Sequence, residues 1–216
     1  MRITKIESQK KNASRKNIYA NGEFIIGVSA ETLLRFGFRT GDEIGEDKLQ
    51  ALQATEALQG AKTVALRFLT HRQRTEREIR DKLREKEFGE EEIEKTIGTL
   101  RDLGYVNDEA FARSYIRNQL TLRPKGKLVL KQKLLLLGVK KETIDAALHE
   151  VFQETSQEDS AREAAQKFLK KSDKTHDDPR KAKQKLAAFL SRRGFSWDIV
   201  SSVTKTVLGE KYSEEE

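Results

Sequence analysis

The sequence predicts a mainly α protein, with tandem three-helix repeats forming an elongated curved array and a small β-hairpin or strand cap at the N-terminus. Two patterns after residue 45 predict the helices. Apolar residues recur there at three- and four-residue steps, which is the helical period, and one 22-residue apolar pattern occurs three times. The first 45 residues instead place β-forming residues around a tight-turn dipeptide, which is typical of strands.

Composition limits both the fold and the function. Charged residues make up 36% of the 216 residues and hydrophobic residues only 36%, so thin helical units fit better than a thick enzyme core. The net charge of +7 favours anionic partners such as nucleic acid. There is no cysteine, which excludes disulfides and thiolate sites. Without a long apolar run or a signal-peptide core, we expect a soluble, cytoplasmic protein.

The N-terminal cap is predicted from turn signals. The Asn-Gly pair at 21–22, between β-forming residues, predicts a hairpin. Residues 1–7 fit a third strand, and the polar, basic segment 10–16 is expected to be a loop. A short helix at 29–36 follows, capped by its first serine and ended by Gly37.

The repeated pattern predicts a helix, a tight turn and a second helix, after a long helix at 47–69. The segments 79–100, 130–151 and 186–207 align without a gap. Their turn position holds Glu87, Gly138 and Gly194. A left-handed residue ends a helix at such a position, and glycine adopts that conformation without strain. Glu87 therefore departs from the pattern.

A further helix is predicted before each segment, so the repeating unit contains three helices. Apolar pairs on either side of each N-cap, Phe88–Ile93, Val139–Ile144 and Phe195–Val200, predict hydrophobic staples that bury these residues. We divide the chain into a β-rich cap at 1–45, helical repeats at 46–105, 106–153 and 160–210, and an acidic tail at 211–216.

No motif predicts catalysis, a cofactor or a metal. The three histidines, His71, His149 and His176, are far apart and lie in polar contexts. The segments 60–63 and 126–128 resemble phosphate loops only in part, because both lack the Gly-Lys-Ser/Thr order. We therefore expect a protein that is not an enzyme.

A basic stretch at 113–141 is the main candidate binding feature. It has nine positive and no acidic residues. Ordinary helix surfaces mix both signs, so contact with phosphates or with an acidic protein groove is the better interpretation. A second basic block at 167–193 is diluted by aspartates. The candidate contacts with nucleic acid or with a protein partner are Arg113, Arg117, Arg123, Lys125, Lys127, Lys131 and Lys133.

Three adjacent motifs resemble the RecX family: residues 105–112 (YVNDEAFA), 113–117 (RSYIR) and 123–126 (RPKG). The resemblance extends over about residues 55–210. It implies a modular, non-enzymatic regulator, expected to be a monomer, that binds the RecA recombinase and its filament on single-stranded DNA. Members of the family alter RecA's ATP hydrolysis, strand exchange and co-protease role in the SOS response, in most cases by inhibition. The resemblance leaves direct contact with DNA open.

The alternative hypothesis is a helical DNA-binding protein, similar to a transcription factor, that acts independently of RecA. Three-helix units with tight turns overlap with helix-turn-helix patterns. Against this hypothesis, the unit occurs three times without a dominant recognition helix, and no feature indicates dimeric half-site binding.

Overall fold

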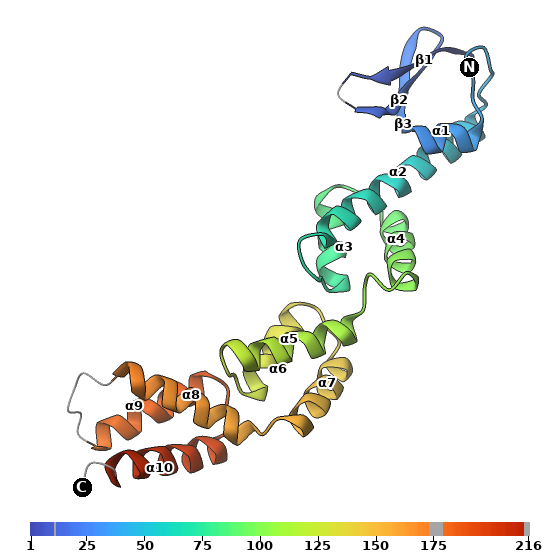
Figure 1. Ribbon diagram of the computed structural model, residues 1–216. Coiled ribbons are helices and arrows are strands. Elements are labelled where there is room, and N and C mark those ends of the chain that lie inside the picture. The colour runs from blue at the N-terminus through green and yellow to red at the C-terminus, as the bar shows by residue number, and fades with distance from the viewer. Residues whose placement is uncertain (11, 173–178, 214–216) are drawn as a thin grey trace. The chain divides into compact units, whose positions relative to one another are not determined.

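The computed structural model describes residues 1–10, 12–172 and 179–213, with side chains described for 1–10, 12–170 and 180–209. These residues form three strands followed by ten helices (Figure 1). The strands are β1 (Ile3–Gln9), β2 (Asn12–Ala20) and β3 (Glu23–Ser29). The helices are α1 (Ala30–Phe36), α2 (Glu46–Leu69), α3 (Glu76–Glu85), α4 (Glu90–Asp102), α5 (Asp108–Leu122), α6 (Lys127–Leu136), α7 (Lys141–Glu154), α8 (Gln157–Ser172), α9 (Pro179–Arg192) and α10 (Trp197–Ser213).

The chain divides into two compact units. The first contains residues 1–73 and 79–105, and the second contains residues 74–78 and 106–216. Of the predicted acidic tail, residues 214–216 lie outside the described residues, and α10 extends to Ser213. Among the described helices, none has the length and apolarity that crossing a bilayer requires.

The cap is a three-stranded antiparallel sheet in the order β1-β2-β3. The predicted hairpin is confirmed: Asn21 and Gly22 have φ angles of 53° and 88° between β2 and β3. The loop predicted at 10–16 is wrong, because β2 begins at Asn12 and Lys16 pairs with both Ser8 and Val28. Backbone pairing on both sides of β2 outweighs the low strand propensity of its polar first half.

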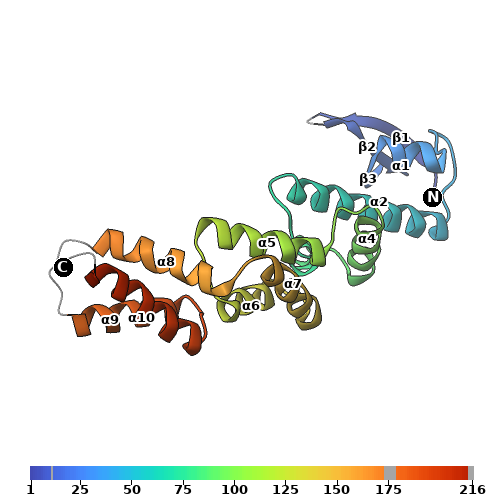
Figure 2. The ribbon, with the colours of Figure 1, turned by 60° about the horizontal axis from the view of Figure 1, so that its bottom comes forward.

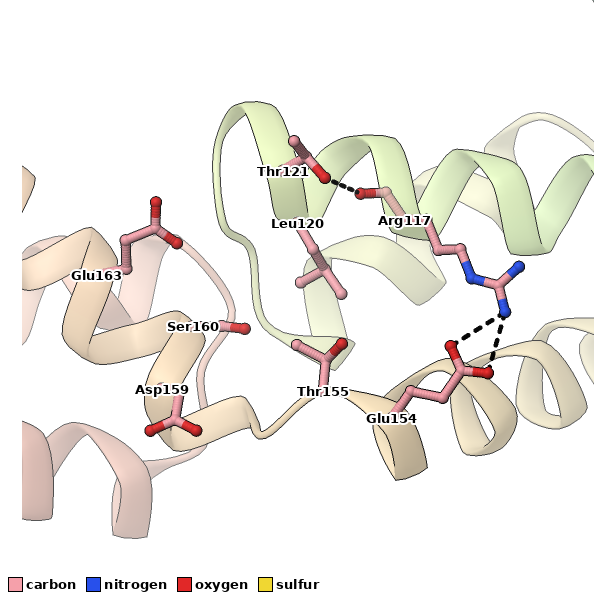
Figure 3. Close-up of a pocket in the computed structure, with 8 residues that line it drawn as sticks. All are labelled: Arg117, Leu120, Thr121, Glu154, Thr155, Asp159, Ser160 and Glu163. Atoms are coloured by element: carbon pink, nitrogen blue, oxygen red, sulfur yellow. Dashed lines mark hydrogen bonds and ion pairs between the residues drawn. The ribbon is translucent and has the colours of Figure 1, made fainter.

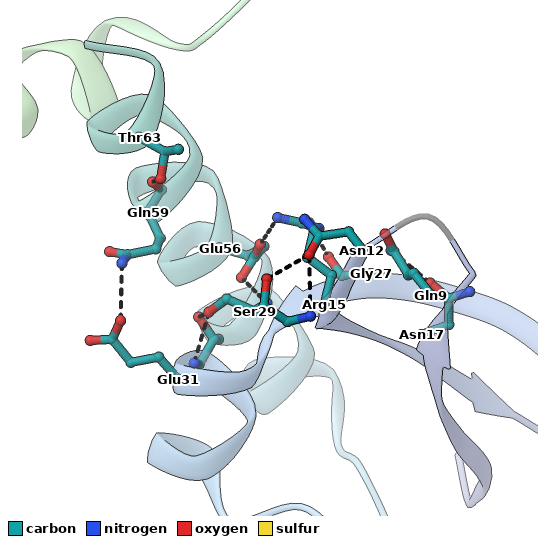
Figure 4. A network of polar contacts seen from close by, with 12 residues as sticks. Gln9, Asn12, Arg15, Asn17, Gly27, Ser29, Glu31, Glu56, Gln59 and Thr63 are labelled. Atoms are coloured by element: carbon teal, nitrogen blue, oxygen red, sulfur yellow. Dashed lines mark hydrogen bonds and ion pairs between the residues drawn. The ribbon is translucent and has the colours of Figure 1, made fainter. Parts of the chain in front are cut away.

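The sheet is fastened to α1 and α2. Ser29 caps α1 by accepting a hydrogen bond from the Thr32 amide, and Gly37 ends the helix at φ 68°, as predicted. An apolar core joins Ile3, Ile18, Val28, Phe38, Ile44 and Leu52. Beside this core, Arg15 of β2 forms a 2.8 Å ion pair with Glu56 of α2, which also accepts a hydrogen bond from the Ser29 amide (Figure 4).

The predicted turn recurs in all three repeats. Glu87, Gly138 and Gly194 have φ angles of 62°, 85° and 84°. At each turn, this residue donates its amide hydrogen three residues back and the next residue donates five residues back, as in Gly138 to Leu135 and Val139 to Leu134. Such a pair of bonds satisfies carbonyls at the helix end that otherwise lack partners. The three turns therefore reverse the chain in the same way.

Each of the last two repeats has its own apolar core. In the second, α5, α6 and α7 bury Ile116, Leu134 and Ile144, among others. In the third, α8, α9 and α10 lie together around Leu190 and Phe195 (Figure 2). The prediction that Phe88 is buried holds only in part, because its side chain is half-buried. Its ring packs beside Gly60 of α2, 3.4 Å from the position that a Cβ atom would take there.

Residues 74–78, which belong to the second unit, contact the turn before α7. The Thr75 hydroxyl donates a 2.6 Å hydrogen bond to the carbonyl of Leu137, one residue before Gly138. A Cβ atom on Gly138 would overlap the side chain of Arg77. Gly138 is therefore required both by its positive φ and by this close approach.

Leu134→Ala is expected to destabilise the second unit by roughly 2–5 kcal/mol, because it removes buried methyl groups and leaves a cavity. Leu134 is fully buried, whereas Leu136 on the same helix is 72% exposed. Leu136→Ala is thus the matched control and should change stability by less than about 0.5 kcal/mol. Urea unfolding followed by far-UV circular dichroism measures both. Equal midpoints would contradict the placement of Leu134 in the core.

Glu87→Gly is expected to stabilise the first unit by about 0.5–1 kcal/mol, because glycine adopts a positive φ without the strain that a Cβ atom causes. The matched control is Glu85→Gly, which puts the same residue into the last turn of α3 and should cost up to about 1 kcal/mol. The same urea titration compares them. A lower midpoint for Glu87→Gly would show that the turn is not strained.

Candidate nucleic-acid interface

The seven predicted contact residues lie on three consecutive segments of the second repeat. Arg113 and Arg117 are on α5, Arg123 and Lys125 are in the loop that follows, and the remaining three lysines are on α6. Gly126 is the N-cap of α6, with an extended backbone. The structure separates six of these residues into two groups with different electrostatic surroundings, and Lys127 belongs to neither.

The first group is neutralised by acidic residues of α7. Arg113 lies 3.5 Å from Glu150. Arg117 lies 3.1 Å from Glu154 (Figure 3). On α6, Lys131 forms an ion pair with Asp145. Exposed ion pairs of this kind contribute little to stability, but they compensate the positive charge of these three side chains within the repeat.

Lys127, at the start of α6, has an aromatic partner on the next helix of the repeat. Its ammonium group lies 5.0 Å from the centre of the Phe152 ring on α7. The ring face attracts the cation through its quadrupole, and it does not cancel the charge. Lys127 thus contacts α7 without a carboxylate partner among the described residues.

The second group lies where the loop at 123–126 meets the turn after α9. The Gly126 amide donates a 2.9 Å hydrogen bond to the Arg193 carbonyl. In return, the Arg193 guanidinium donates a 3.1 Å hydrogen bond from Nη1 to the carbonyl of Pro124, which is buried. These reciprocal bonds fix the loop of the second repeat on the turn of the third.

Two glycines make this approach possible. A Cβ atom on Gly126 would overlap the backbone carbonyl of Gly194. A Cβ atom on Gly194 would come within 2.6 Å of the backbone nitrogen of Val129. Because each collision involves at least one backbone atom, no rotamer change can relieve it fully. The junction therefore depends on glycine at both positions.

This contact brings four cations together, which we call the junction cluster: Arg123, Lys125, Lys133 and Arg193. Burial, followed by the charges of Lys133, Arg193 and Arg123, lowers the pKa of Lys125 from its ordinary value. Burial and the charge of Arg123 likewise lower the pKa of Arg193. Among the described residues, no carboxylate forms an ion pair with any of the four. The junction cluster is thus an uncompensated positive centre.

A pocket of about 430 Å³ in the second unit has the opposite character. Its lining includes Leu120 and the acidic residues Glu154, Asp159 and Glu163, and its one arginine, Arg117, is bound to Glu154 (Figure 3). A phosphate would be repelled there. In the described part of the chain, no three His, Asp or Glu side chains are grouped as metal ligands.

Comparison with known proteins decides the family. Family models match in chain order: the "Regulatory protein RecX N-terminal domain" at residues 1–45, and the first, second and third RecX three-helix domains at 61–100, 107–148 and 156–204. The chain belongs to the RecX family. The four domains of this RecX chain follow the cap and the three repeats of the fold.

Related proteins match this chain over most of its length. Regulatory protein RecX of Clostridioides difficile strain 630 is 34% identical over 208 residues, which is 95% of each chain. That of Bacillus subtilis strain 168 is 34% identical over 203 residues, covering 93% of this chain and 75% of the relative. Both relatives are named regulatory proteins.

Two solved RecX structures resemble this fold. A crystal structure of regulatory protein RecX has a TM-score of 0.71 at 29% identity and covers 94% of this chain and 98% of its own. The crystal structure of RecX from Lactobacillus salivarius has a TM-score of 0.63 at 28% identity, covering 70% and 97%.

Sequence reasoning did not include Arg193 in the contact set of this RecX protein. Arg193 belongs to the third repeat, and it follows Arg123 by 70 positions. The only available signal was its place at the end of the second basic block. That block predicts charge but not which other segment the arginine meets. Residues 173–178 of the block lie outside the described residues.

Gly126→Ala is expected to destabilise the second unit by roughly 1–3 kcal/mol, because the new methyl group pushes the loop off the turn at Gly194. Gly45 is the matched control: it is also a helix N-cap, with φ −76° against −74° for Gly126, and nothing lies within 4 Å of its Cβ position. The urea midpoints of Gly126→Ala and Gly45→Ala measure the difference. Equal shifts would contradict the close backbone contact.

Proposed function

We propose that this RecX protein binds RecA and RecA filaments on single-stranded DNA and lowers their ATPase, recombinase and co-protease activities. The observation that carries the proposal is the ordered match of four RecX domains. Its relatives are named regulatory proteins, in keeping with action by binding rather than by catalysis. In this proposal the protein acts as a cytoplasmic monomer and affects DNA repair and the SOS response.

Repetition of one helical unit suits a periodic partner. Each three-helix repeat offers a similar surface, and several weak contacts to successive subunits of a filament add up to high avidity when their spacing matches. A ligand that contacts several subunits at once favours the filament state to which it binds best. Inhibition follows when that state hydrolyses ATP slowly.

The basic stretch supports contact with the DNA of the filament or with acidic RecA side chains. We propose the seven residues Arg113, Arg117, Arg123, Lys125, Lys127, Lys131 and Lys133 as the contact set. Arg113, Arg117 and Lys131 would have to exchange their carboxylate partners for the new ligand. The remaining four are positive without such an exchange, and they form the stronger part of the set.

The test is the ATPase rate of RecA on single-stranded DNA, titrated with this protein at constant salt. We expect the rate to fall and to reach a plateau at or below one protein per RecA subunit. The titration is repeated with excess single-stranded DNA, which separates action on the filament from sequestration of free DNA. An unchanged rate at stoichiometric protein would overturn the proposal.

A binding assay distinguishes the alternative function. RecA-coated single strands and naked duplex DNA are compared at the same salt concentration. A filament modulator binds the coated strand more tightly. Tight, sequence-dependent binding to naked duplex, together with an unchanged RecA ATPase, would instead support a helical DNA-binding protein that acts independently of RecA.

A further inference from the structure

We propose that the junction cluster is a preformed site for a backbone phosphate of single-stranded nucleic acid, built jointly by the second and third repeats. Three of its cations, Arg123, Lys125 and Lys133, come from the second repeat, and Arg193 comes from the third. The inference deepens the proposed function, because it names the part of the protein that would hold the strand.

The first argument is the unfavourable charge arrangement. The four cations repel one another in the free protein. Burial, followed by repulsion from neighbouring cations, lowers the pKa of Lys125 and of Arg193. The reciprocal hydrogen bonds between the loop and the turn nevertheless hold the cations together. A bound phosphate would remove the repulsion, because an anion at the centre attracts all four groups.

The second argument is that Arg193 is already positioned. Its guanidinium carbon lies 4.8 Å from the centre of the Phe189 ring, and its Nη1 donates to the Pro124 carbonyl. Among the described residues, its Nη2 has no hydrogen-bond acceptor. A guanidinium held in this way loses little conformational entropy when it donates to phosphate oxygens.

The third argument concerns the class of ligand. Trp197 begins α10 and is 71% exposed. It follows Phe195 by two residues, a backbone reach of at most about 7 Å, and the Phe195 amide is in close contact with Gly126. Proteins that bind single strands combine cations for the backbone with aromatic rings on which bases stack. A single strand carries both a phosphate for the cations and a base for an exposed indole ring within this backbone reach.

The experiment measures binding of the full-length protein to an oligothymidine of about 12 nucleotides, without RecA. Binding is followed by the anisotropy of a labelled strand and by the fluorescence of Trp197, which is the only tryptophan in the chain. We expect quenching of this fluorescence at the same DNA concentration at which the anisotropy rises. Binding without quenching would overturn the placement of the strand beside Trp197.

Lys125→Gln and Arg193→Gln are each expected to weaken oligothymidine binding roughly ten-fold, since each removes a charged hydrogen bond to the phosphate. The matched control is Arg192→Gln, which removes the same charge from the neighbouring, exposed position and should weaken binding less than about two-fold, through long-range charge alone. Lys125→Gln also distinguishes loss of binding from loss of folding. Lys125 forms no hydrogen bond within the described residues, so its substitution should leave the fold intact.

Two further measurements sharpen the result. Each cluster variant should reduce the slope of log affinity against log salt by about 0.7. The double variant should lose less than the product of the two single effects, because both groups share one ligand. Equal affinities for Lys125→Gln, Arg193→Gln and Arg192→Gln would overturn the proposal. Preferential binding to polyglutamate at the same salt, lost in the cluster variants, would overturn it in favour of an acidic protein ligand.

The RecA ATPase of the same variants separates this inference from the proposed function. If the parent protein does not affect RecA but the cluster variants lose oligothymidine binding, the proposed function fails and the phosphate site stands. If the parent lowers the ATPase rate and the variants bind oligothymidine as well as Arg192→Gln does, the phosphate site fails and the proposed function stands.

Discussion

The left-handed turn between the second and third helices of each repeat is the constraint on which the rest of the structure depends. Its backbone bonds reverse the chain within a few residues, so that the helices on either side bury a common apolar stripe. The turn also presents a carbonyl to the residue that precedes an earlier helix: Leu137 accepts from Thr75, and Arg193 accepts from Gly126. One local conformation thus serves both the folding of a repeat and the attachment of neighbouring segments.

The same geometry explains why the basic residues behave differently. Arg113 of α5 pairs with Glu150 of α7, and Arg117, one turn later, pairs with Glu154. Both pairs are separated by 37 positions, so the two helices align in the same way at each pair. Helix packing inside a repeat therefore brings opposite charges together. At the junction a loop meets a turn, and no carboxylate of the described residues pairs with the four cations there, so the positive charges accumulate. Charge compensation is a property of the repeat, and charge excess is a property of the junction.

Much of this fold was predictable from the sequence because its signals are local. The Asn-Gly hairpin, the Ser29 cap and the positive φ of Gly138 each depend on a few adjacent residues. β2 was misjudged at its polar start, because its partners supply the pairing. The basic stretch was defined by the absence of acids up to residue 141, and the acids that neutralise it begin at Asp145. Their effect depends on helix packing, which a count along the chain does not contain.

The glycines of this chain differ in how readily another residue can replace them during evolution. At Gly89, the atom nearest to an added Cβ is the end of the flexible Glu92 side chain, which can swing away. At Gly126 the obstacles are backbone atoms of the other segment, and at Gly194 they include the backbone nitrogen of Val129. No second substitution can compensate there, because every residue type has the same backbone. Any descendant that keeps this junction must therefore inherit both glycines together, whereas Gly89 is free to vary.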